Sequence, residues 1–286
     1  MERRVRLITD SVADVPPDLV RQFGIDVIPI YLTIGDKTYR EDGSFDREGF
    51  YWALSRCEGD LTTAAPPPQD FLRAYMALAE EGADVILGIF TADSVSSIYD
   101  HARIAASACS RARVYVVDSR QVSMGTGWLV IRAAEFLEQG MSITEILGAL
   151  REMTGRTLVL GVLNSLDHLR RSGRISSLTQ HVADLMKIKP LMAFEQGEAK
   201  LIARVRTYRR AIERVIEQVN VQKPLTRLAL LHSRADDEII ARLYDSLSVF
   251  VGGGTLPVID VGAVFATHIG PGGLGVAMVR AADTHC

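Results

Sequence analysis

The sequence predicts an α/β protein of two domains, the first built on a mainly parallel, doubly wound sheet and the second on a mixed α/β sheet. The chain has 286 residues, about twice the roughly 150 residues of an average domain. In the first half, apolar runs of strand length alternate with helical periodicity, which favours parallel strands joined by helices. In the second half, two strand-like runs flank a short turn, which indicates an antiparallel hairpin.

In the first half, three apolar strands each end in a polar turn before a helix, and these turns contain Asp10, Ser94 and Asp118. Ligands of parallel sheets bind where such carboxyl ends meet. Residues 25–34 are predicted as a further strand that returns as a hairpin, and residues 40–50 as a polar loop. The predicted strands are 5–9, 25–34, 84–90 and 113–117, and the predicted helices are 18–23, 71–79, 97–106 and 127–137.

The pattern changes near residue 157, where we place the boundary between domains 1–157 and 158–286. The basic stretch that follows precedes a hairpin and further strand and helix patterns. The predicted strands are 157–162, 188–194, 199–205, 227–232 and 256–264, and the predicted helices are 142–153, 178–186, 208–219 and 236–247.

Composition, charge and residue spacing argue against a nucleic-acid binder, a membrane-spanning protein and a metalloprotein. With 32 basic and 35 acidic residues the net charge is −3, too balanced for a general nucleic-acid binder. The N-terminus lacks a signal-peptide pattern and no apolar run is long enough to span a membrane. The six histidines do not have the spacing of metal ligands. We therefore expect a cytoplasmic protein without a metal or transmembrane segment, whose partners are small molecules or proteins.

Residues 93–97 place several hydroxyl groups where a strand passes into a helix. Free backbone N–H groups and the helix dipole favour an anion at such a point, and Ser96 is the candidate ligand. The alternative is that one of these serines only caps the helix.

Thr63 begins a second candidate site, because three prolines follow it at 66–68. Proline cannot continue a helix or a central strand, so this segment is predicted as a rigid extended loop that could hold a hydroxyl group in place. The alternative is that the prolines simply lead into the next helix.

His268 precedes a glycine-rich segment at 270–275 that formally contains the GxGxxG pattern. A dinucleotide site is rejected, because no helix is predicted to follow and no acidic residue lies some twenty positions on. What remains is a histidine at the mouth of a predicted strand, beside a loop whose N–H groups could approach a ligand closely.

Basic residues concentrate in the second half, and Arg170, Arg171, Arg174 and Arg206 are the candidates for contact with a partner or a phosphate. Arginine matches phosphate with a planar fork of donors. The alternative is a solvated charged surface. No GxxxxGK[ST] loop is present, so such a phosphate would belong to another molecule.

Seven motifs in this order resemble the DegV family of fatty-acid-binding proteins, over essentially the whole chain. They are Ile8-Thr9-Asp10-Ser11, Thr63 with its prolines and Phe71, Ser96-Ser97-Ile98-Tyr99, Val117-Asp118-Ser119, Arg171-Ser172-Gly173-Arg174-Ile175-Ser176, Ile188-Lys189-Pro190 and Thr267-His268-Ile269-Gly270-Pro271-Gly272.

The resemblance implies one long-chain fatty acid, such as palmitate, in a tunnel between two domains, and no other cofactor. It implies that Thr63, Ser96 and His268 hold the carboxylate and that the loop from Arg171 to Arg174 corresponds to the family's basic loop. It also implies a role in lipid transport or fatty acid metabolism, with the bound chain presented to a fatty acid kinase for acyl phosphate formation.

Three segments depart from the family pattern. Ala64 and Ala65 stand where the family has Ser-Gln, Ser97 replaces a glycine, and Ser172 replaces the first glycine of the basic loop. Two other functions remain open at this stage. One is an acyl or phosphoryl transferase that uses Ser96 as nucleophile and His268 as base, although no GxSxG motif is present. The other is an adaptor that binds a protein partner.

Overall fold

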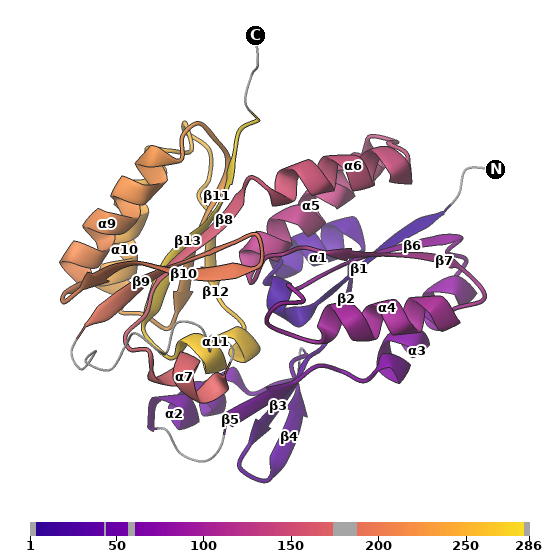
Figure 1. Cartoon of the computed structure of the whole chain (residues 1–286), viewed down its shortest axis with the longest axis horizontal. Coiled ribbons are helices and arrows are strands. Elements are labelled where there is room, and N and C mark those ends of the chain that lie inside the picture. The colour runs from indigo at the N-terminus through magenta and orange to yellow at the C-terminus, as the bar shows by residue number, and fades with distance from the viewer. Residues whose placement is uncertain (1–3, 43, 57–60, 174–187, 283–286) are drawn as a thin grey trace.

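The structure is a computed structural model that describes residues 4–42, 44–56, 61–173 and 188–282. Within these residues it contains a parallel sheet, a mixed sheet and a small antiparallel sheet (Figure 1). The parallel sheet has the order β2 (Asp26–Ile28), β1 (Val5–Asp10), β6 (Val85–Phe90), β7 (Arg113–Asp118). The predicted fold class is confirmed.

In the part of the chain that the structure describes, the mixed sheet contains six strands, and only its pair β11 and β12 is parallel. Its order is β10 (Glu198–Val205), β9 (Lys189–Glu195), β8 (Thr157–Val162), β13 (Gly273–Arg280), β11 (Leu225–Ser233), β12 (Val258–Asp260). The small sheet has the order β4 (Lys37–Arg40), β3 (Tyr31–Ile34), β5 (Leu61–Ala64).

Helices cover the outer faces of the two large sheets and fill the space between them. On the parallel sheet, α3 (Pro68–Glu80) and α4 (Ile98–Ala108) contact β6, and on the mixed sheet α9 (Tyr208–Val221) and α10 (Asp237–Ser248) lie on the outer face (Figure 1). The other helices in the described residues are η1 (Ser11–Ala13), α1 (Pro17–Phe23), α2 (Arg47–Arg56), α5 (Met124–Glu138), α6 (Ile143–Thr154), α7 (Asp167–Ser172) and α11 (Ala263–Ile269).

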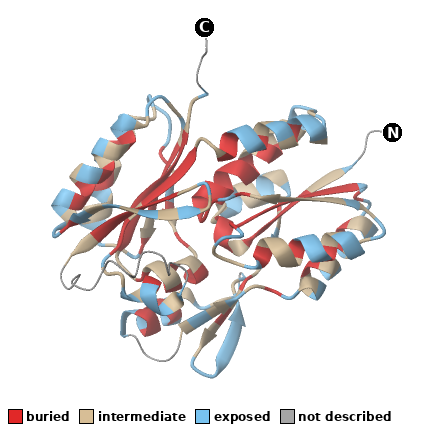
Figure 2. Ribbon diagram, viewed as in Figure 1, coloured by how far each residue is buried: buried red, intermediate tan, exposed pale blue. Residues whose placement is uncertain are grey.

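Helix α5 joins the two large sheets, because it contacts β1 and β6 on one side and β8, β11 and β13 on the other. A helix between two sheets must be apolar around most of its circumference, and ten residues of α5 are buried (Figure 2). Trp128 packs in this shared core and donates its indole N–H to the carbonyl oxygen of Ala277 on β13, 3.1 Å away. The two halves of the chain therefore share a hydrophobic core cluster around α5.

Three local predictions in the first half were wrong. Residues 25–34 do not form one strand, because β2 ends before Pro29 and β3 pairs in another sheet. Proline has no N–H to donate to a strand ladder, so Pro29 interrupts the strand pairing between the end of β2 and the start of β3. The extended loop at 61–64 is the strand β5, which pairs with β3, and α2 begins within the predicted loop 40–50. The hairpin of β3 and β4 is confirmed.

The largest differences lie near the C-terminus. The predicted strand 256–264 is only β12, and α11 follows it, so His268 lies on a helix rather than at the mouth of a strand. The glycine-rich segment enters β13, a central strand that the sequence did not reveal. A Cβ atom at Gly275 would clash with the carbonyl oxygen of Leu160, so this glycine permits the close approach to β8. The predicted helix 178–186 lies outside the described residues.

The shared core predicts different costs for the two tryptophans. Trp128→Ala is expected to lower the free energy of unfolding by about 3–5 kcal/mol, because it leaves a cavity and a buried carbonyl without its donor. Trp52 on α2 is 55% exposed, so the matched change Trp52→Ala is expected to cost less than about 1 kcal/mol. Urea unfolding of both variants measures the difference, and equal costs would contradict the shared core.

Candidate functional site

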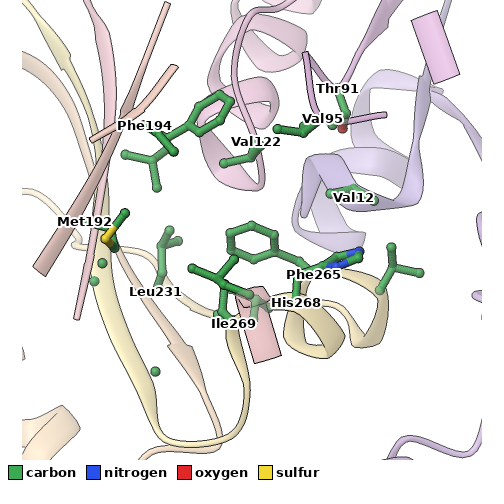
Figure 3. A pocket seen from close by; sticks show the side chains of 18 of the residues that line it. Val12, Thr91, Val95, Val122, Met192, Phe194, Leu231, Phe265, His268 and Ile269 are labelled. Carbon is green, nitrogen blue, oxygen red and sulfur yellow. The ribbon is translucent and has the colours of Figure 1, made fainter. Parts of the chain in front are cut away.

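An apolar cavity of about 150 Å³ lies between the two large sheets, where the resemblance implies a ligand (Figure 3). A cavity with mostly apolar walls suits an apolar ligand. The walls come from both halves of the chain and are mostly aliphatic or aromatic. The side chains around it include Val12, Val95, Val122, Val159, Met192, Phe194, Leu231, Phe265 and Ile269.

Thr63 and His268 form a polar pair in the wall of this cavity. The Oγ1 atom of Thr63 lies 2.9 Å from the Nε2 atom of His268, and both residues line the cavity. Thr63 lies on β5, opposite Leu32 of β3, and His268 lies in the last turn of α11. The small sheet and α11 therefore bring together two residues that are 205 positions apart.

Ser96 lines the same cavity and lies in the turn between β6 and α4. Its Oγ atom accepts a long hydrogen bond, 3.4 Å, from the backbone N–H of Ile98. Ser97 is the residue that precedes α4, and its side chain makes no capping hydrogen bond. The structure thus places Ser96, Thr63 and His268 around one cavity.

The position of α11 depends on two acidic residues from the first half of the chain. Asp14 Oδ1 accepts a hydrogen bond from the N–H of Gly262 at 2.7 Å, and Glu41 Oε1 accepts one from Val264 at 3.1 Å. These are N–H groups at the start of a helix, which lack partners within the helix and favour negative charge. Ser123 donates to the other oxygen of Asp14, and Ser11 donates to the other oxygen of Glu41 at 2.8 Å.

Enclosure of these carboxylates changes their titration. Burial is the largest influence on Asp14 and raises its pKa to about 7, against the opposing effect of the hydrogen bonds from Ser123 and Gly262. Burial also raises the pKa of Glu41. Asp10, at the end of β1, is 1% exposed, and burial raises its pKa to about 6 although Thr91 and Val12 donate hydrogen bonds to it.

Helix α2 holds the segment just before α11. Arg47 donates to the carbonyl oxygen of Val261 at 2.8 Å and forms an ion pair of 3.2 Å with Asp260. The hydroxyl group of Tyr51 donates to the same carbonyl oxygen at 3.2 Å. Sequence reasoning identified none of Asp14, Glu41, Arg47 or Tyr51, because their partners are more than 200 positions away and no motif links them.

Helix α7 packs against α11 and carries two of the predicted basic residues. His168 of α7 lies against Gly270 at the end of α11, and burial followed by the charge of Arg171 lowers its pKa. Arg170 and Arg171 are exposed in the last turn of α7, next to the helix that carries His268. Arg206 is exposed between β10 and α9.

Arg174 lies outside the described residues. Among the described residues, no group of three or more histidine, cysteine or acidic side chains could hold a metal ion. No helix in the described part of the chain is both long and apolar enough to cross a membrane.

Comparison with known proteins identifies the family. A family model described as "Uncharacterised protein, DegV family" matches residues 4–281. A DegV domain-containing protein of Caldanaerobacter subterraneus is 30% identical over 96% of this chain and 98% of its own length. Protein DegV of Bacillus subtilis is 29% identical over 95% of this chain and 98% of its own length.

Solved structures agree with this match. A DegV family protein of Thermus thermophilus, described in terms of its fatty acid binding, has a TM-score of 0.87 and 29% identity, covering 96% of this chain and 99% of that chain. DegV of Bacillus subtilis, described as a fatty acid binding protein, has a TM-score of 0.86 and 26% identity, covering 97% of this chain and 99% of that chain.

The fold and the site define an α/β protein with an apolar cavity between its parallel and mixed sheets and polar groups in the wall of that cavity. The chain belongs to the DegV family.

The raised pKa values of Asp10 and Asp14 predict how stability depends on pH. Both groups hold a proton more tightly in the folded chain than in the unfolded chain, whose carboxyl pKa is near 3.8. Their contribution is therefore complete below about pH 4 and is lost as the pH rises toward about 7, with a slope of up to about 1.4 kcal/mol per pH unit for each group.

The variant Asp14→Asn removes one of these groups. The parent must ionise an enclosed carboxyl group as the pH rises from 5 to 8, and it loses stability as it does so. The variant has no such group, so its free energy of unfolding is expected to increase relative to that of the parent over this range. Urea unfolding at each pH measures the difference. Parallel stability curves for the two proteins would contradict the raised pKa of Asp14.

Proposed function

We propose that the cavity binds one long-chain fatty acid, such as palmitate, and that Thr63, Ser96 and His268 hold its carboxylate. The observation that carries this proposal is the pairing of the Thr63 hydroxyl with the His268 imidazole, 2.9 Å apart, in the wall of an apolar cavity. The family relatives from Thermus thermophilus and Bacillus subtilis, both described as fatty acid binding, support the same ligand class.

The chemistry of the site suits an amphipathic anion. A carboxylate removed from water needs hydrogen bonds or a positive charge, and such bonds are stronger than those between neutral groups. The two hydroxyl groups are donors, and the C-terminal end of a helix, where His268 lies, favours a cationic side chain. Each methylene group buried by the cavity wall adds about 0.8 kcal/mol, so the alkyl chain supplies most of the binding energy and the polar residues orient the ligand.

The bound fatty acid is presented, in this proposal, to a fatty acid kinase that forms the acyl phosphate in the cytoplasm, which gives the protein a role in lipid transport or fatty acid metabolism. Arg170 and Arg171 support it, because they are exposed on the helix that packs against α11. Arg206, and Arg174 outside the described residues, complete the proposed contact with the partner or its phosphate. The protein itself performs no chemistry, so turnover of acyl substrates by the purified chain alone would favour the transferase instead.

The two domains of this proposal are residues 1–157 and 158–286. The division is supported by the order of the strands, since all strands of the parallel sheet end before residue 157 and the mixed sheet begins at this boundary residue, the first of β8.

Removal of two hydroxyl groups tests the carboxylate site. The double variant Thr63→Val and Ser96→Ala is expected to weaken palmitate binding by about tenfold or more, because a hydrogen bond to a charged group contributes about 1.5–3 kcal/mol. The matched control is Thr62→Val, the exposed neighbour on β5, whose side chain points to the other face of the strand. Isothermal titration calorimetry measures all three proteins, and equal affinities would refute the assignment.

A further inference from the structure

The turn between β9 and β10 reaches across to the first half of the chain (Figure 1). Three hydrogen bonds hold it there. Ser94 Oγ donates to the carbonyl oxygen of Gly197 at 2.6 Å, the Arg120 guanidinium donates to the carbonyl oxygen of Gln196 at 2.7 Å, and the N–H of Gly197 donates to the carbonyl oxygen of Arg120 at 2.9 Å. We call these four residues the clasp.

Every part of the clasp adjoins the wall of the cavity. Val95 follows Ser94, Val122 lies two positions after Arg120, and Phe194 and Ala199 lie two positions outside the turn on β9 and β10; all four line the cavity. In Figure 3 the ring of Phe194 faces Val122 and Val95, across the cavity from Phe265 and Ile269 of α11. The clasp therefore closes the side of the cavity opposite α11.

The clasp is more exposed than the contacts between the two halves that lie in the core. Ser94, Arg120 and Gln196 are exposed. By contrast, the hydrogen bond from the Gln121 side chain to Thr157, 2.8 Å long, is buried, as is the bond from Trp128 to Ala277 described above. Exposed hydrogen bonds exchange readily with water, so local opening is expected at the clasp before it occurs at the buried contacts.

The sheet allows the turn to move without loss of a central strand pair. Pairing of β9 with β8 ends at Phe194 and Val159, so residues 195–198 make no ladder pair with β8. The register of β9 and β10 shifts between Leu201 and Ala203, and such bulges bend a hairpin locally. Glu195, the last residue of β9 before the turn, is anchored by an ion pair with Arg280 of β13, 2.5 Å long. Movement can thus be confined to the turn itself.

We propose that the clasp is the gate through which the alkyl chain of the ligand enters and leaves the cavity. The turn at 196–197 separates from Ser94 and Arg120, the wall between Phe194 and Val95 opens to solvent, and the three hydrogen bonds re-form once the ligand is enclosed. This inference rests on the proposed fatty acid function, because it describes how that ligand is exchanged.

A reversible covalent lock tests the gate directly. A Cβ atom at Gly197 would lie 3.9 Å from the Cβ atom of Ser94, inside the range of roughly 3.5–4.5 Å found in disulfides. The variant carries Ser94→Cys and Gly197→Cys in a chain whose three native cysteines are replaced by serine. Gly197 has a positive φ of 83°, so the substitution strains the turn, but equally in the oxidised and reduced forms.

The measurement is the release of a bound fluorescent long-chain fatty acid into excess palmitate, followed by stopped-flow fluorescence. Oxidised protein is expected to release the probe at least about tenfold more slowly than the same protein after reduction, because affinity changes act mainly through dissociation and the lock blocks the exit path. The parent with serine at all three native positions is the control, and its rate is expected to be independent of the reductant.

A second variant tests the gate without a disulfide, in case the two introduced cysteines do not form one. Ser94→Ala removes one clasp hydrogen bond and is expected to speed release about threefold. Ser107→Ala is its matched control, because Ser107 is an exposed serine on α4 that bonds only a carbonyl oxygen of its own helix.

The outcomes separate the gate from the ligand. Equal release rates in the oxidised and reduced forms, or in Ser94→Ala and Ser107→Ala, would overturn the gate and leave fatty acid binding standing. Failure of the reduced protein and the parent to bind any long-chain fatty acid would overturn both.

Discussion

The contact between the start of α11 and the carboxylates of Asp14 and Glu41 is the constraint on which the site depends. It draws a seven-residue helix from near the end of the chain onto the first half. His268, at the other end of that helix, is thereby brought to Thr63. Without this contact the cavity would lose one wall, since Phe265 and Ile269 lie on the same helix.

The constraint is costly, because the two carboxyl groups are enclosed and burial raises the pKa of both. Two features offset the cost: hydrogen bonds from Ser123 and Ser11 to the carboxylates, and the positive end of the helix dipole. The same physical logic applies to the proposed ligand, whose carboxylate also needs donors in a nearly apolar enclosure. The acidic groups and the proposed ligand site lie at opposite ends of α11, which separates like charges.

Much of the first sheet could be predicted from the sequence, because strand and helix periods are local properties and the polar turns after β1, β6 and β7 mark where strands end. Ser96, Thr63 and His268 were singled out by local chemistry and by family resemblance, and the structure places them around one cavity. The partners of α11 could not be predicted, since Asp14 and Glu41 contact residues more than 200 positions away. Strand β13 was missed because a glycine-rich sequence is typical of a loop. The structure shows why a glycine is needed within this strand, since Gly275 lies against the backbone of Leu160.

The central claim is that this cavity holds a single acyl chain, and the most direct test is native mass spectrometry of the protein as purified, followed by chromatography of the extracted lipid. The account predicts an added mass equal to one long-chain fatty acid per chain, which would also identify the ligand. Protein that is empty as purified, and stays empty after incubation with a panel of free fatty acids, would contradict it.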